Sequence, residues 1–241
     1  MIVYGINAVA EAVRAGRARE VRVADRTDAR VRAILDEAER RRVPVRRVPR
    51  EALDQDAAGG RHQGVVAEVA GAPAATLEAL ARPGDPPPLV VVLDGVEDPQ
   101  NVGAVLRTVD AAGASGVVRQ SRRAAPLAGA AARASAGAVH HVPVADVVNI
   151  ARALEELKAL GVWCVGLDAE AERPYYELDL TVPTALVVGA EGHGLRRLVR
   201  DRCDLLAAIP MSGRVSSLNV SAAAAIVLFE AVRQRRSRGR Q

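Results

Sequence analysis

The chain has 241 residues, of which 49% are hydrophobic and 26% are charged, and its formal net charge is +4. This composition excludes a wholly disordered chain, and the length suffices for one large domain or for a large and a small one. No apolar run approaches the ~20 residues of a membrane-spanning helix, the first residues lack a signal-peptide layout, and the only two cysteines are far apart. We therefore expect a cytoplasmic protein with no membrane segment, no disulfide framework and no metal site.

The first 70 residues alternate between helical and strand patterns. The apolar spacing predicts helices over 6–15 and 28–42, and strands over 20–24, 43–48 and 64–69. This alternation indicates a small α/β domain over residues 1–70. Residues 71–88 follow with a cluster of prolines that cannot continue a helix or a central strand, so we interpret them as a stiff linker.

After the linker, buried strands and helices alternate on a larger scale. Leu89–Leu93 is a continuous apolar run, which is typical of a strand covered on both faces. Further strands are predicted over 116–118, 162–167, 184–188 and 205–209, and helices over 101–112, 149–160, 195–202 and 217–235. This order predicts a mostly parallel α/β sheet over residues 89–241. Trp163 and Phe229 are interpreted as core residues of this domain.

In open α/β sheets ligands bind where strands end, so the segments after the buried runs are the candidate sites. The first such segment is 94–101 (DGVEDPQN), and Arg107 interrupts the apolar helix that follows it. Asn101 could serve only as the cap of that helix, and Arg107 could be a solvated helical arginine. A site at this edge is the alternative to these purely structural roles.

Two further segments at strand ends are unusually polar. The run 189–194 (GAEGHG) has neither the GxGxxG nor the GxxxxGK[ST] spacing, which excludes both standard phosphate-binding loops. Its glycines allow a ligand close to the backbone, although a plain turn is the alternative. In 209–221 (IPMSGRVSSLNVS), Ser216 or Ser217 is expected to cap the last helix. That cap leaves Asn219 unexplained, since asparagine is a poor helix former.

Three segments, DGVEDPQNVGAVLRT, LVVGAEGHGLRRLV and IPMSGRVSSLNVSAAAA, resemble the three motifs of the SpoU class of RNA ribose 2′-O-methyltransferases, in the SPOUT superfamily. The resemblance covers residues 89–235 in order and spacing. YGINAVAEAV, RHQGVVAEV and residues 125–143 are similar to a bacterial subgroup that methylates a guanosine of 23S ribosomal RNA. In that subgroup residues 1–70 correspond to an L30e-like RNA-binding domain, and Asn7 stands where a histidine is usual.

The resemblance implies a trefoil-knotted α/β domain, a homodimer with active sites at its interface, and S-adenosylmethionine as the methyl donor without a metal. It implies a reactive set of Asn101, Arg107, Glu191, Ser217 and Asn219, with the arginine supplied by the partner subunit. It implies cofactor binding at Gly189, Ile209, Met211 and Leu218. Candidate RNA contacts are Arg46, Arg47, Arg61, His62, Arg122 and Arg123.

A ribose 2′-hydroxyl is a weak acid, so methyl transfer requires an oriented hydroxyl and a stabilised developing charge. Because a guanidinium is essentially always protonated, we interpret Arg107 as an electrostatic stabiliser and phosphate clamp rather than as a base. The expected substrate is 23S ribosomal RNA or a pre-ribosomal particle. The alternatives are a transfer RNA enzyme, an antibiotic-resistance enzyme acting elsewhere on 23S RNA, a non-catalytic RNA-binding protein and, remotely, a nucleotide-binding oxidoreductase.

Overall fold

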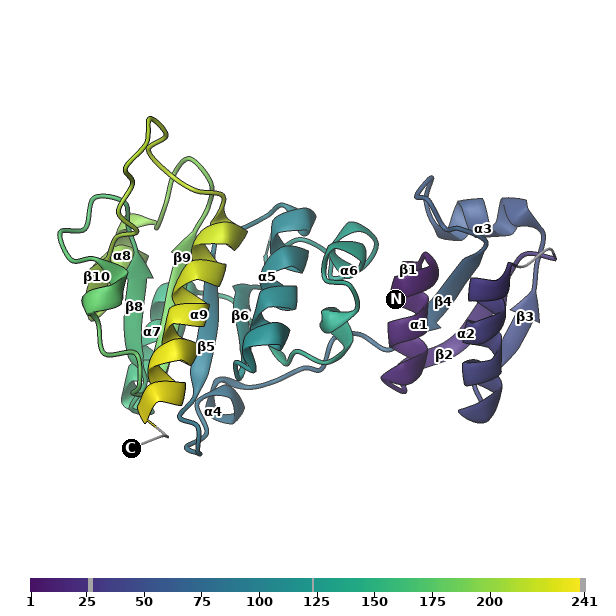
Figure 1. Ribbon diagram of the computed structural model, residues 1–241, viewed down its shortest axis with the longest axis horizontal. Coiled ribbons are helices and arrows are strands. Elements are labelled where there is room, and N and C mark those ends of the chain that lie inside the picture. Colours follow the sequence, from purple (N-terminus) through teal and green to yellow (C-terminus); the bar gives the residue numbers. More distant parts are fainter. Residues whose placement is uncertain (26–27, 123, 239–241) are drawn as a thin grey trace.

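The computed structural model describes residues 1–25, 28–122 and 124–238, which form two units, each built around one sheet (Figure 1). The first unit has strands in the order β1-β4-β2-β3, with β2 and β3 parallel and the other pairs antiparallel. Its strands are β1 (Ile2–Tyr4), β2 (Ala18–Val23), β3 (Val45–Arg47) and β4 (Val65–Val69). The helices are α1 (Ile6–Arg14), α2 (Ala29–Arg40) and α3 (Arg50–Asp56).

Apolar side chains of α1 and α2 pack on one face of this sheet, and Leu53 of α3 packs on the other, against Tyr4 and Val66. The α/β character predicted for the N-terminal region is therefore confirmed. This unit contacts the second one through its β1 and α1 side. There the Arg133 guanidinium carbon lies 4.8 Å from the centroid of the Tyr4 ring, a cation–π contact.

The second unit is a six-stranded, all-parallel sheet with strand order β10-β8-β9-β5-β6-β7. Its strands are β5 (Leu89–Asp94), β6 (Gly116–Gln120), β7 (Val144–Val147), β8 (Trp163–Leu167), β9 (Thr184–Gly189) and β10 (Leu205–Ala207). Every residue of the central strand β5 is buried, as its uninterrupted apolar run predicts. The predicted parallel α/β sheet is confirmed.

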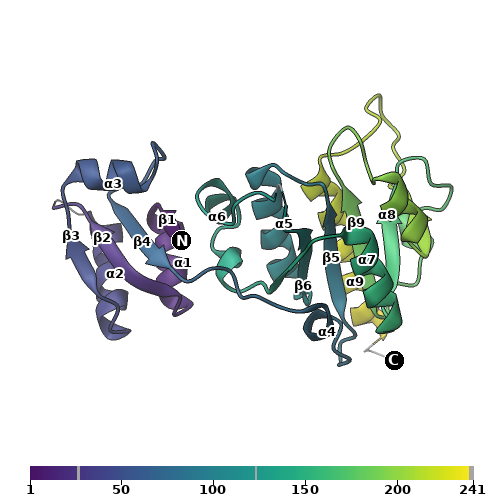
Figure 2. The ribbon, with the colours of Figure 1, turned by 180° about the vertical axis from the view of Figure 1, so that it is seen from behind.

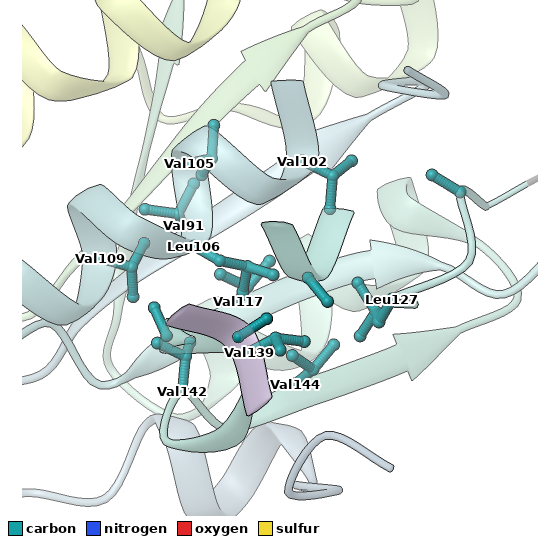
Figure 3. Packing of buried hydrophobic residues seen from close by; sticks show 14 of the residues in the cluster. Val91, Val102, Val105, Leu106, Val109, Val117, Leu127, Val139, Val142 and Val144 are labelled. Atoms are coloured by element: carbon teal, nitrogen blue, oxygen red, sulfur yellow. The ribbon is translucent and has the colours of Figure 1, made fainter. Parts of the chain in front are cut away.

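Helices cover both faces of this sheet (Figures 1 and 2). One face carries α5 (Pro99–Ala112), α6 (Ala130–Ala134) and α9 (Val220–Arg238), and the other α4 (Leu77–Leu80), α7 (Ile150–Ala159) and α8 (Arg197–Arg202). Two short 3-10 helices span Ala138–His140 and Tyr175–Glu177. Figure 3 shows how the inner side of α5, including Leu106 and Val109, packs on Val117 of β6 and on Val139 and Val142.

The proline-rich segment is only partly a linker. Thr76 caps α4 by accepting a hydrogen bond from the Ala79 backbone N–H at 3.2 Å, and Leu77 and Leu80 are buried against the second sheet. Ala74 forms a bridge with Val144. The prolines of 83–88 follow this helix and lead directly into β5, so the segment is attached to the second unit through most of its length.

Trp163 and Phe229 are not core residues, contrary to the sequence-based expectation. Trp163 is 52% exposed because it opens β8 at the amino edge of the sheet, where the covering helices end. Phe229 is 48% exposed because it lies on the side of α9 that faces away from the sheet. Neighbouring Val227 and Leu228 take the inward positions of the helix.

Near its carboxyl end, α9 is fastened to the sheet by Arg235. The guanidinium donates to four backbone carbonyls, those of Pro87, Pro88, Leu180 and Val182. Prolines have no N–H, so the segment before β5 can be held only through its carbonyls. Burial also lowers the pKa of Arg235.

We expect Arg235→Gln to lower the free energy of unfolding by about 2–3 kcal/mol, because it leaves partly buried carbonyls without charged donors. Urea unfolding measures this loss. Arg236→Gln, at an exposed position of the same helix, serves as the control and should leave stability unchanged. Equal stability of the two variants would contradict this role for Arg235.

A second stability prediction concerns His140, which is 2% exposed and has neither ring nitrogen hydrogen-bonded. Burial, with smaller contributions from the charges of His141 and Arg17, lowers its pKa from 6.5 to about 4. Between these two pH values the unfolded chain binds more protons than the folded one, so stability falls as the pH decreases from 7 to 4. The loss amounts to about 3 kcal/mol over that range.

Unfolding measured between pH 7 and pH 4 tests this prediction. His140→Phe should flatten the pH dependence, whereas the control His141→Gln, at an exposed position, should retain it. If all three proteins lose stability in parallel on acidification, His140 is not the titrating group.

Candidate active site

The three polar segments predicted from the sequence meet at the carboxyl edge of the second sheet. Strands β5 and β9 are parallel neighbours whose last residues, Asp94 and Gly189, are paired in register. The loop 95–98 into α5 and the loop 190–196 into α8 therefore start side by side. The third segment, 208–219, runs from β10 to the start of α9.

Asn219 joins all three segments through a single side chain. Its amide nitrogen donates to Asn101 Oδ1 at 2.9 Å and to Glu191 Oε1. Its amide oxygen accepts from the backbone N–H groups of Ser221, at 2.9 Å, and Ala222, at 3.4 Å. Both N–H donors thus face acceptors and the oxygen faces donors, which fixes the orientation of the amide. We name Asn101, Glu191 and Asn219 the polar triad.

Two helix caps differ from the sequence-based expectation. Asp98, not Asn101, caps α5, since its carboxylate accepts from the Gln100 N–H at 3.1 Å. Asn101 lies in the first turn of α5 and is 8% exposed, so its side chain is committed to the polar triad. The last helix begins at Val220, and Asn219 occupies the capping position expected of Ser216 or Ser217.

A cavity of about 950 Å³ opens beside the polar triad. It lies at the ends of β8, β9 and β10, and its walls include Leu167, Val188, Gly189, Glu191, Ile209, Met211, Ser217, Leu218 and Asn219. The four residues predicted to bind a cofactor and three of the five predicted reactive residues therefore line one cavity. Its size and its mixture of apolar walls with a few polar groups are typical of a small-molecule site.

Backbone packing shapes this cavity at Gly189. A Cβ atom there would lie 2.1 Å from the Gly194 carbonyl carbon and 2.4 Å from the Leu195 nitrogen. The loop 190–194 folds back on β9, and the Gly194 N–H donates to the Ala190 carbonyl at 2.9 Å. Only glycine permits so close an approach of the loop to the strand.

Arg107 is not among the residues that line this cavity. It lies six residues after Asn101 in α5, which places the two side chains about 120° apart around the helix axis. Asn101 is buried, whereas Arg107 is exposed. Within one chain, the structure therefore brings Asn101, Glu191, Ser217 and Asn219 to one place and leaves Arg107 outside it.

Family models and known proteins match this chain over most of its length. The model of the SpoU rRNA methylase family matches residues 88–229, and the model named RNA 2′-O ribose methyltransferase substrate binding matches residues 2–75. The chain belongs to the SpoU rRNA methylase family. The 23S rRNA (guanosine-2′-O-)-methyltransferase RlmB of Pseudomonas aeruginosa is 45% identical over 239 residues, covering 97% of this chain and 96% of that protein.

Solved structures of SpoU proteins have the same architecture. The SpoU methyltransferase AviRb of Streptomyces viridochromogenes in complex with AdoMet superposes with a TM-score of 0.82 and 30% identity, over 98% of this chain and 91% of AviRb. The A. aeolicus TrmH/SpoU tRNA modifying enzyme superposes with a TM-score of 0.58 and 32% identity, but covers only 68% of this chain. The chain is thus an S-adenosylmethionine-dependent SpoU methyltransferase.

The cavity fits this methyl donor. Leu167, Val188 and Ile209 provide apolar surface, and the backbone groups of the loop segments provide donors and acceptors. Asp168 and Glu170 at the wall, with Glu191, offer carboxylates to a cationic ligand, although Arg200 pairs with Asp168 at 2.9 Å. Within residues 1–25, 28–122 and 124–238, no group of three or more His, Cys, Asp or Glu side chains is arranged to hold a metal ion.

The residues predicted to contact RNA differ in their exposure to solvent. Arg46 and Arg47 are exposed on the edge strand β3, and Arg61 and Arg122 are exposed in loops. His62 is 3% exposed, with Nε2 3.0 Å from Asp54 Oδ1 and Nδ1 accepting from the Gly64 N–H. This histidine therefore stabilises a turn and is not accessible to RNA. Arg123 lies outside the described residues.

Sequence reasoning missed two pairs of charged residues next to the SpoU motifs. Asp168 accepts from the Glu170 N–H at 2.9 Å, but it also lines the cavity and pairs with Arg200. Asp94 is buried at the end of β5 and pairs with Arg196. A carboxylate directly after a wholly apolar strand is the signal that would have identified Asp94.

Proposed function

We propose that this SpoU protein transfers a methyl group from S-adenosylmethionine to the ribose 2′-hydroxyl of a guanosine in 23S ribosomal RNA. The observation that carries the proposal is the polar triad beside the 950 Å³ cavity, which unites the three polar segments of the sequence. The match to an RlmB protein over 97% of the chain supports 23S RNA and guanosine. The RNA is expected as 23S RNA or a pre-ribosomal particle, and we place the reaction in the cytoplasm, where ribosomal RNA is made.

The proposed roles follow from the side-chain chemistry. S-adenosylmethionine would supply a methyl group activated by its sulfonium: the bond from the methyl carbon to sulfur would break as the bond to the 2′ oxygen forms, S-adenosylhomocysteine would leave, and the hydroxyl proton would pass to solvent. Asn219 fixes Glu191 and Asn101 at the cavity mouth, so that the ribose hydroxyl meets preset hydrogen-bonding partners. Ser217 adds a hydroxyl at the cavity wall. Arg107 stabilises the charge that develops on the 2′ oxygen and holds the adjacent phosphate.

The position of Arg107 favours a homodimer as the active form. Arg107 is exposed on α5, and α5 lies beside α9 (Figure 1). The outward side of α9 is apolar at helical spacing, with Ala222, Ala225, Ile226 and Phe229. A second copy covering α5 and α9 would bury this stripe and bring its Arg107 toward the first copy's cavity. We also propose that the second unit contains the trefoil knot that the family implies.

Ribosomal RNA is favoured over transfer RNA by the N-terminal unit. The RlmB relative matches nearly the whole chain, whereas the A. aeolicus tRNA modifying enzyme covers only 68% of it. We propose that Arg46, Arg47, Arg61 and Arg122 contact the RNA backbone, since exposed arginines suit phosphate groups.

In the part of the chain that the structure describes, no helix is long and apolar enough to cross a membrane.

Methyl incorporation from labelled S-adenosylmethionine tests the substrate. Unmodified 23S RNA, 16S RNA, bulk transfer RNA and pre-ribosomal particles are offered in parallel. We expect label in 23S RNA or the particle alone. Label in transfer RNA would overturn the substrate and keep the chemistry, and no label in any RNA would overturn the proposal.

A further inference from the structure

Asp94, the last residue of β5, carries a buried carboxylate. Its side chain is 0% exposed. Oδ2 accepts from the Arg196 backbone N–H at 2.8 Å, and Oδ1 accepts from Arg196 Nε at 2.6 Å and forms an ion pair with Nη2. One residue, 102 positions away, therefore satisfies this carboxylate from both its backbone and its side chain.

This pair closes the loop that carries Glu191. The loop leaves β9 after Gly189, turns back through the Gly194 N–H to Ala190 carbonyl bond, and enters α8 after Arg196. Its first end is fixed by the pairing of β9 with β5, and its second end is fixed by the pairing of Arg196 with Asp94, the last residue of β5. Both anchors are thus on the strand that also leads to Asn101.

We propose that Asp94 and Arg196 are positioning residues for methyl transfer. Their ion pair holds the 190–194 loop at a fixed position relative to the end of β5, so that Glu191 reaches Asn219. This inference rests on the proposed function for its kinetic effect, and on the geometry alone for its effect on the loop. Neither residue is a member of the polar triad, and Asp94 has no exposed atom with which to touch a substrate.

A direct contact between Arg196 and an RNA phosphate is the competing explanation, because the Arg196 side chain is 51% exposed. Asp94 separates the two explanations. A positioning pair predicts the same defect from either partner, whereas an RNA contact predicts a defect from Arg196 alone, seen as a raised KM for RNA.

The kinetic test compares Asp94→Asn, Arg196→Gln and the double variant, which removes both charges and so leaves no unpaired buried charge if a single variant fails to fold. Each is expected to lower kcat about tenfold to 100-fold, with the KM for 23S RNA within about twofold of wild type. Arg197→Gln is the matched control, because Arg197 is the next residue and its side chain is 96% exposed. It should behave as wild type.

A double-mutant cycle with Glu191→Gln provides the readout that a merely structural role would not change. If Arg196 acts through Glu191, adding Arg196→Gln to Glu191→Gln lowers kcat by no more than about twofold. If the losses of kcat in Arg196→Gln and Glu191→Gln multiply in the combined variant, the inference is overturned. A raised KM for RNA in Arg196→Gln, together with wild-type kinetics in Asp94→Asn, would overturn it as well.

A third readout needs no RNA, and so remains decisive if the proposed function fails. Amide hydrogen exchange over residues 190–196 should accelerate in Asp94→Asn and Arg196→Gln, with unchanged exchange in the strands of the first sheet. Wild-type exchange rates in both variants would contradict the positioning role whatever the substrate.

Discussion

Replacing Arg107 with alanine should lower kcat about 100-fold to 1,000-fold while the affinity for S-adenosylhomocysteine stays within about twofold of wild type. Arg107 is exposed on α5 and does not line the cavity of its own chain, so its removal leaves the cofactor walls intact. The loss falls on turnover because the guanidinium acts on charge that develops during transfer. Initial rates and calorimetric binding measure the two quantities, and equal losses of turnover and affinity would contradict this role.

Subunit mixing then tests where the arginine acts. Arg107→Ala and Glu191→Gln chains are each expected to be nearly inactive, but a heterodimer of the two has one site with both residues if Arg107 comes from the partner. Mixed chains are therefore expected to regain activity, up to one working site per heterodimer. No recovery on mixing would place Arg107 in its own chain's site. Arg152→Ala, at an exposed position on α7, is the control for loss of a helical arginine and should remain active.

Asn219→Asp is the second substitution with a large expected effect. Aspartate keeps the oxygen that caps α9, so the helix and the free energy of unfolding should be preserved. It loses both N–H donors and sets a carboxylate against Glu191, whose oxygen now faces a like charge. We expect kcat to fall at least about 100-fold as the polar triad comes apart.

The matched control is Asn149→Asp, which makes the same change at the cap of α7, where Asn149 Oδ1 accepts from the Arg152 N–H at 3.2 Å. This variant should retain full activity. Thermal unfolding and initial rates of the two variants decide between the roles of Asn219. An Asn219→Asp protein that turns over normally would show that its link to Glu191 and Asn101 is not needed.

The long elements could be predicted from the sequence because their apolar pattern alone determines them. The runs at 89–93 and 184–188 are strands buried on both faces, and the stripe of α2 follows from its period. The elements that were missed are short. α3 spans seven residues, α6 is an alanine-rich turn and a half, and β7 has four residues after a proline. Such segments are stabilised mainly by their neighbours, which a sequence pattern does not describe.

The site was predictable in its location but not in its connections. Strand ends and glycine spacing indicated all three polar segments, and resemblance to the SpoU motifs indicated the residues within them. The double use of Asn219, as helix cap and as partner of Asn101 and Glu191, depends on how segments 118 and 28 residues apart meet. The pairing of the buried Asp94 with Arg196, and the exposure of Arg107, likewise depend on tertiary packing.

The position of the transferred methyl group tests the central claim most directly. 23S RNA methylated by the protein with labelled S-adenosylmethionine is digested to nucleosides, which are separated and identified by mass spectrometry. We predict a single labelled product, 2′-O-methylguanosine, in which the label is retained on the ribose after the base is removed. Label on a base, or on no nucleoside while the protein still binds S-adenosylhomocysteine, would contradict the account.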